Sequence, residues 1–493
     1  TIGNTAVGWN ALYQYDLETE NTAIGSEAMA GAGASNYCVA VGAGALSGAT
    51  TTDANFTVAI GYIAGRNITS GKRNLAIGGY ALESLTVGDD NIAIGYGALA
   101  DTTANTNIAI GSYSMIQHTT GTRNMAIGSY TMQDTDAGSN SLGSSDNIFI
   151  GHTAGGGTWT DVDSNRNVTL GNYTMDAATA GALDNVAVGH YALSSITSGD
   201  YNTVLGSNAG LSLTTGADNV VIGYLAGDTM TNTGNTVLIG KGAGTAINSD
   251  SANYTIAIGF DALANLTNGT GNIAIGGATQ KGITTGDNNI ALGYFAMDDF
   301  NAGVNSGNSS GNIAIGTSAM GGTVTNVACN DNIAIGNNTM AAALDGALYN
   351  IAIGVTSLND LTTGDKNISI GNNSLQKLTT GEGNVAIGYN ALAANKRNDF
   401  NTAVGYRALT AMSASSAGTT GNTAVGSWCG DSVTTGTFNT LMGQYAGQAI
   451  TTGNYNNIIG SQAGYYATGS YNTFVGQDAG LGGTTSAPFS SGQ

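Results

Sequence analysis

The chain has 493 residues, and its 12 basic and 32 acidic side chains give a net charge of −20 at pH 7. A surface of this sign repels phosphate, so nucleic acid is not expected as a ligand. No apolar run reaches the roughly 20 residues of a membrane-spanning helix, and the three scattered cysteines, Cys38, Cys329 and Cys429, do not suggest an intrachain disulfide framework.

A short repeat runs along the chain. A glycine that ends an apolar triplet recurs 27 times from Gly8 to Gly476, and 15 of the 26 intervals are 17 residues long. A fixed period of about 20 residues is typical of a solenoid. We therefore predict an all-β fold, a parallel β-solenoid of about 27 coils, as a single array over residues 1–480 with a non-repeat tail at 481–493.

A longer repeat lies above the short one. The intervals 23, 20, 18, 17, 17, 17 follow both Gly128 and Gly293, which indicates a duplicated nine-coil block at about 129–293 and 294–458. The chain also opens in mid-unit without an initiator Met. We expect it to be a segment of a longer protein or a trimmed product.

Each coil begins with the pattern Asn-x-Ala-Ile-Gly, in which asparagine stands four residues before the glycine in 23 of 27 coils. Strand side chains alternate between two faces, so the large aliphatic residues lie on one face and Ala with Gly on the other. We expect the large residues to fill the coil interior and the small face to meet the backbone of another chain. The asparagines should stack as a structural ladder beside the glycines, as in other cross-β arrays; representatives are Asn91, Asn124, Asn312, Asn384, Gly95, Gly128, Gly316 and Gly388.

A second element follows the glycine, in its fullest form Tyr-x-Ala-Leu, as in residues 96–99 and 389–392. We expect it to be a second strand that supplies the opposite wall of the coil. A Thr-Thr-Gly corner then turns the chain, as at residues 379–381, because glycine tolerates positive φ.

Aromatic residues recur directly after the strand-ending glycine and form a broken row: Tyr62, Tyr96, Tyr224, Phe260, Tyr294, Tyr389 and Tyr406. Two interpretations stay open. The row either packs between coils or chains, or it is a platform for carbohydrate.

The longer coils contain extra residues, which should protrude as loops on one face because an insertion is tolerated only outside the stack. These loops cover residues 134–146, 155–165, 300–311, 321–331 and 410–421. An exposed Trp159 beside two aspartates either stacks on a sugar ring or covers its own loop. The possible receptor-contact residues are Trp159, Asp161, Asp163, Asn305, Asn308 and Asn326.

No metal site, cofactor or catalytic centre is predicted. His118, His152 and His190 are the only histidines, and their spacing in the array does not bring several ligands to one ion. Acidic corner residues such as Asp89, Asp90, Asp365 and Glu382 are expected to be screened by solvent cations, since the calcium-binding nonapeptide repeat is missing. The chain is not expected to be an enzyme.

The repeated Asn-x-Ala-Ile-Gly motif with its second small-residue segment resembles the head repeats of YadA-like trimeric autotransporter adhesins, and equally the β-roll repeats of bacteriophage tail fibres. The resemblance covers about residues 1–480. It implies a left-handed β-roll, a homotrimeric rod and an extracellular place on a virion or a bacterial surface, with a cell-surface glycan or protein as receptor. The 17-residue coil is longer than the usual head repeat of that family.

The function expected from these features is that of a structural and adhesive fibre segment, such as a phage tail fibre used in host attachment. The head of a bacterial adhesin is the alternative within the same class. A solenoid that binds ice through rows of threonine is the alternative from another class, and it requires flat, unbroken rows.

Overall fold

The structure is a computed structural model of the chain. It describes residues 3–14, 19–31, 33–48, 53–135, 143–160, 162–248, 250–300, 308–324, 326–413 and 418–481. The predicted tail lies outside these residues except for Leu481.

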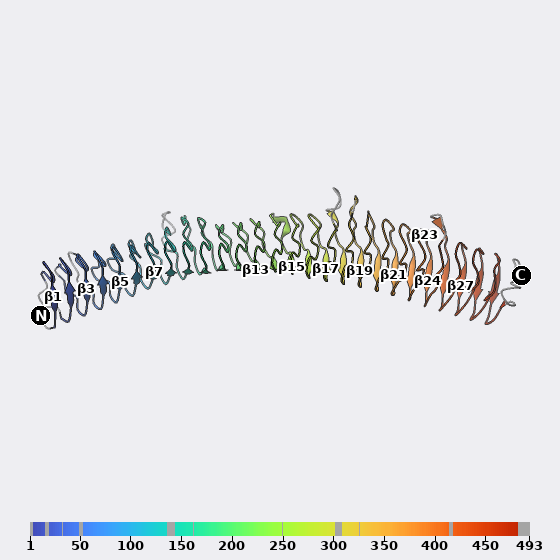
Figure 1. Cartoon of the computed structure of the whole chain (residues 1–493), viewed down its shortest axis with the longest axis horizontal. Helices are drawn as coiled ribbons and strands as arrows, with labels where there is room; N and C mark the ends of the chain where they lie inside the picture. Colours follow the sequence, from blue (N-terminus) through green and yellow to red (C-terminus); the bar gives the residue numbers. More distant parts are fainter. Residues whose placement is uncertain are drawn as a thin grey trace. The chain divides into compact units, whose positions relative to one another are not determined.

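The chain forms two compact units, unit 1 of residues 1–242 with 248–250 and unit 2 of residues 243–247 with 251–493. In each unit, three-residue strands lie side by side in parallel along one edge (Figure 1). The strands of unit 1 are β1 (Thr5–Val7), β2 (Thr22–Ile24), β3 (Val39–Val41), β4 (Val58–Ile60), β5 (Leu75–Ile77), β6 (Ile92–Ile94), β7 (Ile108–Ile110), β8 (Met125–Ile127), β9 (Ile148–Ile150), β10 (Val168–Leu170), β11 (Val186–Val188), β12 (Thr203–Leu205), β13 (Val220–Ile222) and β14 (Val237–Ile239).

The strands of unit 2 are β15 (Ile256–Ile258), β16 (Ile273–Ile275), β17 (Ile290–Leu292), β18 (Ile313–Ile315), β19 (Ile333–Ile335), β20 (Ile351–Ile353), β21 (Ile368–Ile370), β22 (Val385–Ile387), β24 (Thr402–Val404), β26 (Thr423–Val425), β27 (Thr440–Met442), β28 (Asn457–Ile459) and β29 (Thr473–Val475). A short 3₁₀ turn, η1 (Asp250–Ala252), precedes β15, and β23 (Asn398–Asp399) pairs with β25 (Gly418–Thr419) apart from the ladder. The two units make a parallel β-solenoid of about 26 turns with a spacing of about 17 residues, which confirms the predicted fold class.

The strands pair residue for residue, even where the intervening coil is long. Ala126 of β8 pairs with Phe149 of β9 across a 23-residue interval, and Ala291 pairs with Ala314 across another. The insertions therefore leave the register of the ladder unchanged.

Each strand turns its middle residue toward the coil interior. The alanines at this position, such as Ala93 and Ala386, have no exposed surface, whereas the flanking Ile387 and Leu205 are 37% and 47% exposed. The prediction that the large residues fill the interior is therefore wrong. The interior is already occupied by buried leucines and methionines of the second wall, such as Leu392, which leave room for little more than a methyl group beside the strand.

Where the middle residue is a large apolar one, the second wall has no large side chain at the opposite position. In seven coils with Phe, Val, Leu or Ile in the middle of the strand, the fourth residue after the strand-ending glycine is itself glycine. A Cβ atom at Gly155 would lie 2.6 Å from the Phe149 ring, and one at Gly464 would lie 2.8 Å from Cδ1 of Ile458. The pairs are Phe149 with Gly155, Val204 with Gly210, Val221 with Gly227, Leu238 with Gly244, Leu441 with Gly447, Ile458 with Gly464 and Phe474 with Gly480. In these coils the glycine thus leaves room for the large strand residue, as close packing requires. Gly65 and Gly430 face the small Ala59 and Ala424 instead, and there Ile68 and Leu441 lie close to the glycine.

The second wall is not the β-strand that the sequence predicts. Ala98 and Leu99 are consecutive and both fully buried, whereas a strand would send one of them outward. Both side chains point to the same side because the backbone enters the left-handed region at Gly97 (φ 65°) and Leu99 (φ 49°). Its N–H groups still bond between coils, from Gly97 to the Gly79 carbonyl at 2.9 Å and from Leu99 to the Ser114 carbonyl at 3.0 Å.

The strand-ending glycines allow a close backbone approach, but within one chain. Gly388 has a φ of 135°, and a Cβ atom there would lie 2.4 Å from the carbonyl oxygen of Gly405 in the next coil. The close approach that the small residues predict is therefore between successive coils, and its assignment to a second chain is wrong.

Candidate functional site

The outward side of the strands is an aliphatic surface. We call it the aliphatic face and define it as the first and third residues of the ladder strands. The third residue is Ile, Val, Leu or Met in every ladder strand, and none of these strands contains a charged residue. Ile275 and Ile315 are each 38% exposed, and Leu170 is 50% exposed. The first residue is threonine in seven of the ladder strands and asparagine in β28, so the apolar character of the face comes mainly from the third residues. Exposed apolar residues gathered in this way mark an interaction site in a protein.

A row of aromatic rings runs along unit 1 beyond the strand-ending glycines. Successive ring centroids are 4.8 to 6.1 Å apart from Tyr62 to Tyr191. The row contains Tyr62, Tyr80, Tyr96, Tyr113, Tyr130, His152, Tyr173 and Tyr191. Some of its rings come from the first position after the glycine and others from the second. A search of the first position alone therefore misses part of the row. The rings pack between coils, which is one of the two interpretations left open above.

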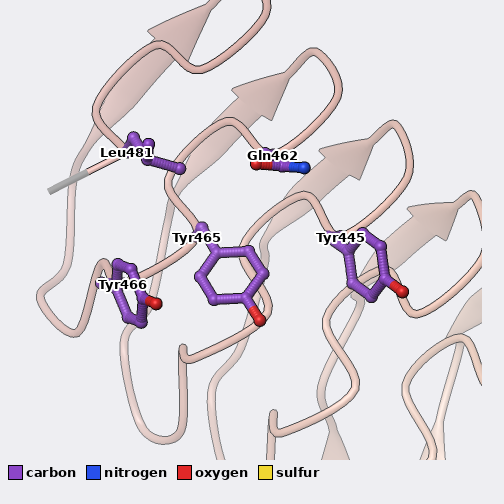
Figure 2. Close-up of a pocket in the computed structure, with 5 residues that line it drawn as sticks. All are labelled: Tyr445, Gln462, Tyr465, Tyr466 and Leu481. Atoms are coloured by element: carbon purple, nitrogen blue, oxygen red, sulfur yellow. The ribbon is translucent and has the colours of Figure 1, made fainter. Parts of the chain in front are cut away.

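A second aromatic group in unit 2 surrounds a pocket of about 360 Å³ (Figure 2). We call this pocket the tyrosine cup; its lining residues are Tyr445, Gln462, Tyr465, Tyr466 and Leu481. The Tyr465 ring meets the Tyr466 ring at 4.6 Å and 71°, and it meets the Tyr445 ring at 6.0 Å and 55°. In Figure 2 the Tyr465 ring is seen face-on between the other two tyrosines.

An open groove of about 500 Å³ occupies the comparable part of two coils in unit 1. Its lining residues are Tyr113, Ile116, Gln117, Tyr130, Gln133 and Asp134. The Tyr113 and Tyr130 rings are stacked at 5.5 Å and 19°, so each ring covers part of a face of the other. The groove therefore offers mainly ring edges and amide groups.

The asparagines form a buried ladder along the stack. Oδ1 of Asn74 accepts from the backbone N–H of Asn91 at 2.9 Å and from its side-chain amide at 3.1 Å. The Asn91 amide also donates to the Ala104 carbonyl at 2.9 Å, at the corner of the following coil. The predicted ladder residues Asn124, Asn312 and Asn384 make the same bonds. Their amides are buried and hydrogen-bonded, so these residues contribute to the stability of the stack.

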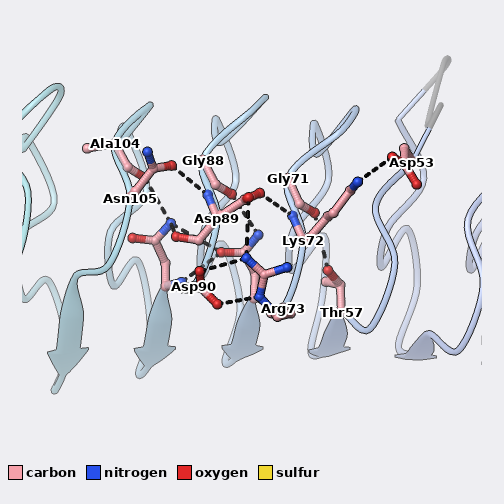
Figure 3. Close-up of polar contacts among 12 residues, drawn as sticks. Asp53, Thr57, Gly71, Lys72, Arg73, Gly88, Asp89, Asp90, Ala104 and Asn105 are labelled. Carbon is pink, nitrogen blue, oxygen red and sulfur yellow. Dashed lines mark hydrogen bonds and ion pairs between the residues drawn. The ribbon is translucent and has the colours of Figure 1, made fainter.

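Charged corner residues pair between coils (Figure 3). Nε of Arg73 donates to Asp90 at 2.6 Å, and Oδ1 of Asn105 accepts from the backbone N–H of Asp89 at 2.7 Å. The Arg73 guanidinium lowers the pKa of Asp90 through this hydrogen bond and its charge. Asp365 instead accepts from the backbone N–H of Leu348 at 2.8 Å. Within the described ranges, no cluster of three or more His, Cys, Asp or Glu side chains could hold a metal ion.

The corner threonines are engaged within the stack. The hydroxyl of Thr197 donates to the Thr214 carbonyl at 3.0 Å, and that of Thr214 donates to the Thr231 carbonyl at 2.9 Å. Thr362 and Thr379 repeat this arrangement in unit 2. Hydroxyls used in this way bind the next coil, so the geometry gives no specific support to the ice-binding alternative.

Trp159 is not the exposed residue that the sequence suggested. It has no exposed surface, its ring centroid lies 5.7 Å from that of Phe149, and Nε1 donates to the Gly155 carbonyl at 3.2 Å. The extra residues of this coil fold Trp159 back onto the interior. It therefore covers its own loop, as the second of its two interpretations holds.

The other candidate loop residues are dispersed. Asp163 accepts from the backbone N–H of Gly143 at 3.2 Å, Asn308 accepts from the Thr285 hydroxyl at 2.8 Å, and the exposed Asn326 donates its backbone N–H to Asp345 at 3.2 Å. Asp161 and Asn305 lie outside the described residues. The structure does not bring the described members of this set together into one site.

Burial alters the acid–base behaviour of a few side chains. His118 is buried, with Nδ1 at 2.8 Å from the Thr135 hydroxyl, and burial lowers its pKa to about 4. Cys38, Cys329 and Cys429 are buried free thiols. Burial raises the pKa to about 11 for Cys38 and Cys329 and to about 12 for Cys429, so these thiols are protonated and unreactive.

In the described residues, the structure contains no helix with the length and apolar character needed to cross a membrane. Comparison of the chain with protein-family models gives no match, and comparison with curated proteins gives none either.

Proposed function

We propose that this chain is a segment of an extracellular homotrimeric attachment fibre, such as a bacteriophage tail fibre, that self-associates through the aliphatic face. The observation that carries the proposal is the half-exposed state of large aliphatic residues in strand after strand, as for Ile148, Val168 and Val186 at 37–38%. Leaving this surface in water costs about 25 cal/mol for each Å² of apolar area.

A second copy of the chain is the occupant that fits this face. The rows carry no charge, and they repeat at the spacing of the strands, so another copy presents a surface of the same shape, polarity and length. A closed assembly of three chains follows from the resemblance to β-roll adhesins and tail fibres. Such an assembly would bury the aliphatic face of each chain and leave the second walls and the loops free to contact a receptor.

The native mass tests the proposal. Sedimentation equilibrium of the chain is expected to give three times the 49.1 kDa of one copy. Replacing Ile275 and Ile315 together with lysine places two charges on the aliphatic face, and the double variant should dissociate to single chains with its far-UV circular dichroism retained.

A matched control places lysine elsewhere. Tyr349→Lys changes a 55%-exposed residue at a corner position where the next coil has Lys366. This variant should keep the native mass. A wild-type particle of 49.1 kDa, or a double variant that stays assembled, would contradict the proposal.

A further inference from the structure

In the described part of the chain, the tyrosine cup has hydrogen-bonding groups without a partner around the half-buried Tyr465 ring. Tyr465 lies between Tyr445 and Tyr466, and the steep angles of 55° and 71° between the rings prevent either neighbour from stacking on its face (Figure 2). Among the described residues, neither the Gln462 amide nor the hydroxyls of the three tyrosines have a hydrogen-bond partner. The half-buried Leu481 adds an apolar edge.

This combination matches the surface of a sugar ring. A pyranose has an apolar face of C–H groups that can lie on an aromatic ring, and a rim of hydroxyls that both donate and accept hydrogen bonds. The amide of Gln462 supplies two donors and one acceptor, and each phenol can donate or accept. The volume of about 360 Å³ lies in the range of small-molecule sites, about 300–1,000 Å³.

We propose that the tyrosine cup binds a hexopyranose unit of a glycan, with the sugar stacked on Tyr465 and its hydroxyls bonded to Gln462 and the flanking phenols. This inference rests on the proposed attachment function and names its receptor class. The cup is lined by no carboxylate, so it lacks the counter-charge that a bound ammonium group would favour.

The groove of unit 1 is an internal comparison. It is lined by two tyrosines, two glutamines, an isoleucine and an aspartate, and Tyr113 and Tyr130 stack on each other at 19°, whereas neither Tyr445 nor Tyr466 stacks on Tyr465. If the sugar requires a ring on which no neighbouring ring is stacked, the cup binds it and the groove does not. Sugar binding in the cup but not in the groove would therefore show that ring stacking, and not surface polarity in general, determines the binding.

Saturation-transfer difference NMR on the full chain tests the proposal. The probes are the methyl pyranosides of glucose, galactose, mannose and N-acetylglucosamine, with tetramethylammonium as a cation. Irradiation of aromatic protons should transfer saturation to the ring C–H protons of at least one pyranoside. Tyr465→Ala should weaken that binding about tenfold, which corresponds to about 1.4 kcal/mol.

Matched variants locate the effect. Tyr465→Phe keeps the ring and should retain most of the binding, Gln462→Ala should weaken it, and Tyr113→Ala in the groove should leave it unchanged. The proposal is overturned if no pyranoside receives saturation, if Tyr465→Ala binds as well as wild type, or if tetramethylammonium alone is bound.

The native mass of the same samples separates this inference from the fibre proposal. If the chain is trimeric but binds no pyranoside, the sugar-site proposal is contradicted and the fibre proposal stands. If a single chain of 49.1 kDa binds a pyranoside, the sugar-site proposal stands and the proposed assembly is contradicted.

Discussion

Oδ1 of Asn367 accepts two hydrogen bonds from Asn384 of the next coil, one from the backbone N–H at 3.0 Å and one from the side-chain amide at 3.1 Å. Asn384 in turn donates to the Asn398 carbonyl at 2.8 Å and accepts from the backbone N–H of Asn401 at 3.0 Å. One buried amide therefore connects three coils.

Replacement of Asn384 by alanine should lower the free energy of unfolding by about 3 kcal/mol, because a buried N–H and a buried carbonyl lose their partner at roughly 1–3 kcal/mol each. Asn384→Thr should cost less, since Thr236 stands at the same position of its coil and its hydroxyl donates to Asn219 at 2.7 Å. Urea denaturation of both variants checks this. Equal losses would show that the hydrogen bonds contribute little beyond the volume of the side chain.

Gly388→Ala should destabilise the protein by about 3 kcal/mol or more. The substitution combines positive φ, which costs about 1–3 kcal/mol for a non-glycine residue, with a Cβ atom placed 2.4 Å from the Gly405 carbonyl. Gly418→Ala is the control, because nothing lies within 4 Å of a Cβ atom there. Thermal unfolding of the two variants should differ clearly, and similar midpoints would contradict the close approach between coils.

The complementary volumes of the two walls predict a non-additive pair. Ala93→Leu alone should destabilise by about 1–3 kcal/mol through overpacking against the second wall. Leu99→Gly alone should cost about 3 kcal/mol through the cavity it leaves. The double variant reproduces the pairing of Leu441 with Gly447, so it should be more stable than the sum of the single changes predicts. A double-mutant cycle measured by denaturation decides this, and strict additivity would show that the walls do not compensate.

His118 should make stability depend on pH. Its pKa is lowered by burial to about 4, from an ordinary value of 6.5. Between these values the unfolded chain binds a proton that the folded chain does not, so the contribution is complete above pH 6.5 and is lost as the pH falls toward 4. The loss amounts to about 3 kcal/mol at 1.36 kcal/mol per unit.

Denaturation midpoints measured from pH 7.5 to 4 check this prediction. His118→Gln should flatten the profile over the window. His152→Gln, which changes an exposed histidine, is the control variant. A wild-type slope that survives His118→Gln would assign the dependence to other groups.

Much of the local structure follows from the sequence because each coil repeats the same short sequence motif. The spacing of the glycines places the strands, and the glycine at Gly388 predicts a close backbone approach because no larger residue fits there. The asparagine pattern likewise predicts a stacked amide at Asn384. These features depend on one coil and its nearest neighbour, which share the same short motif.

The candidate sites follow less directly. The aromatic row of unit 1 mixes two positions after the glycine, so Tyr80 and Tyr113 are missed when only the first is searched. Trp159 was expected at a surface because it lies in an insertion, but its loop returns it to Phe149. The tyrosine cup joins residues of three coils, and the angles between its rings depend on how those coils pack.

By itself the sequence determined the period, the parallel register and the division of each strand into a small and a large face, since alternation is a property of any strand. Only the tertiary structure decided which face is inside. The interior is narrow, and the left-handed backbone at Leu99 turns two consecutive side chains, Ala98 and Leu99, into it. Ala93 therefore points inward and the flanking isoleucines point outward, because the space left beside the second wall is too small for them.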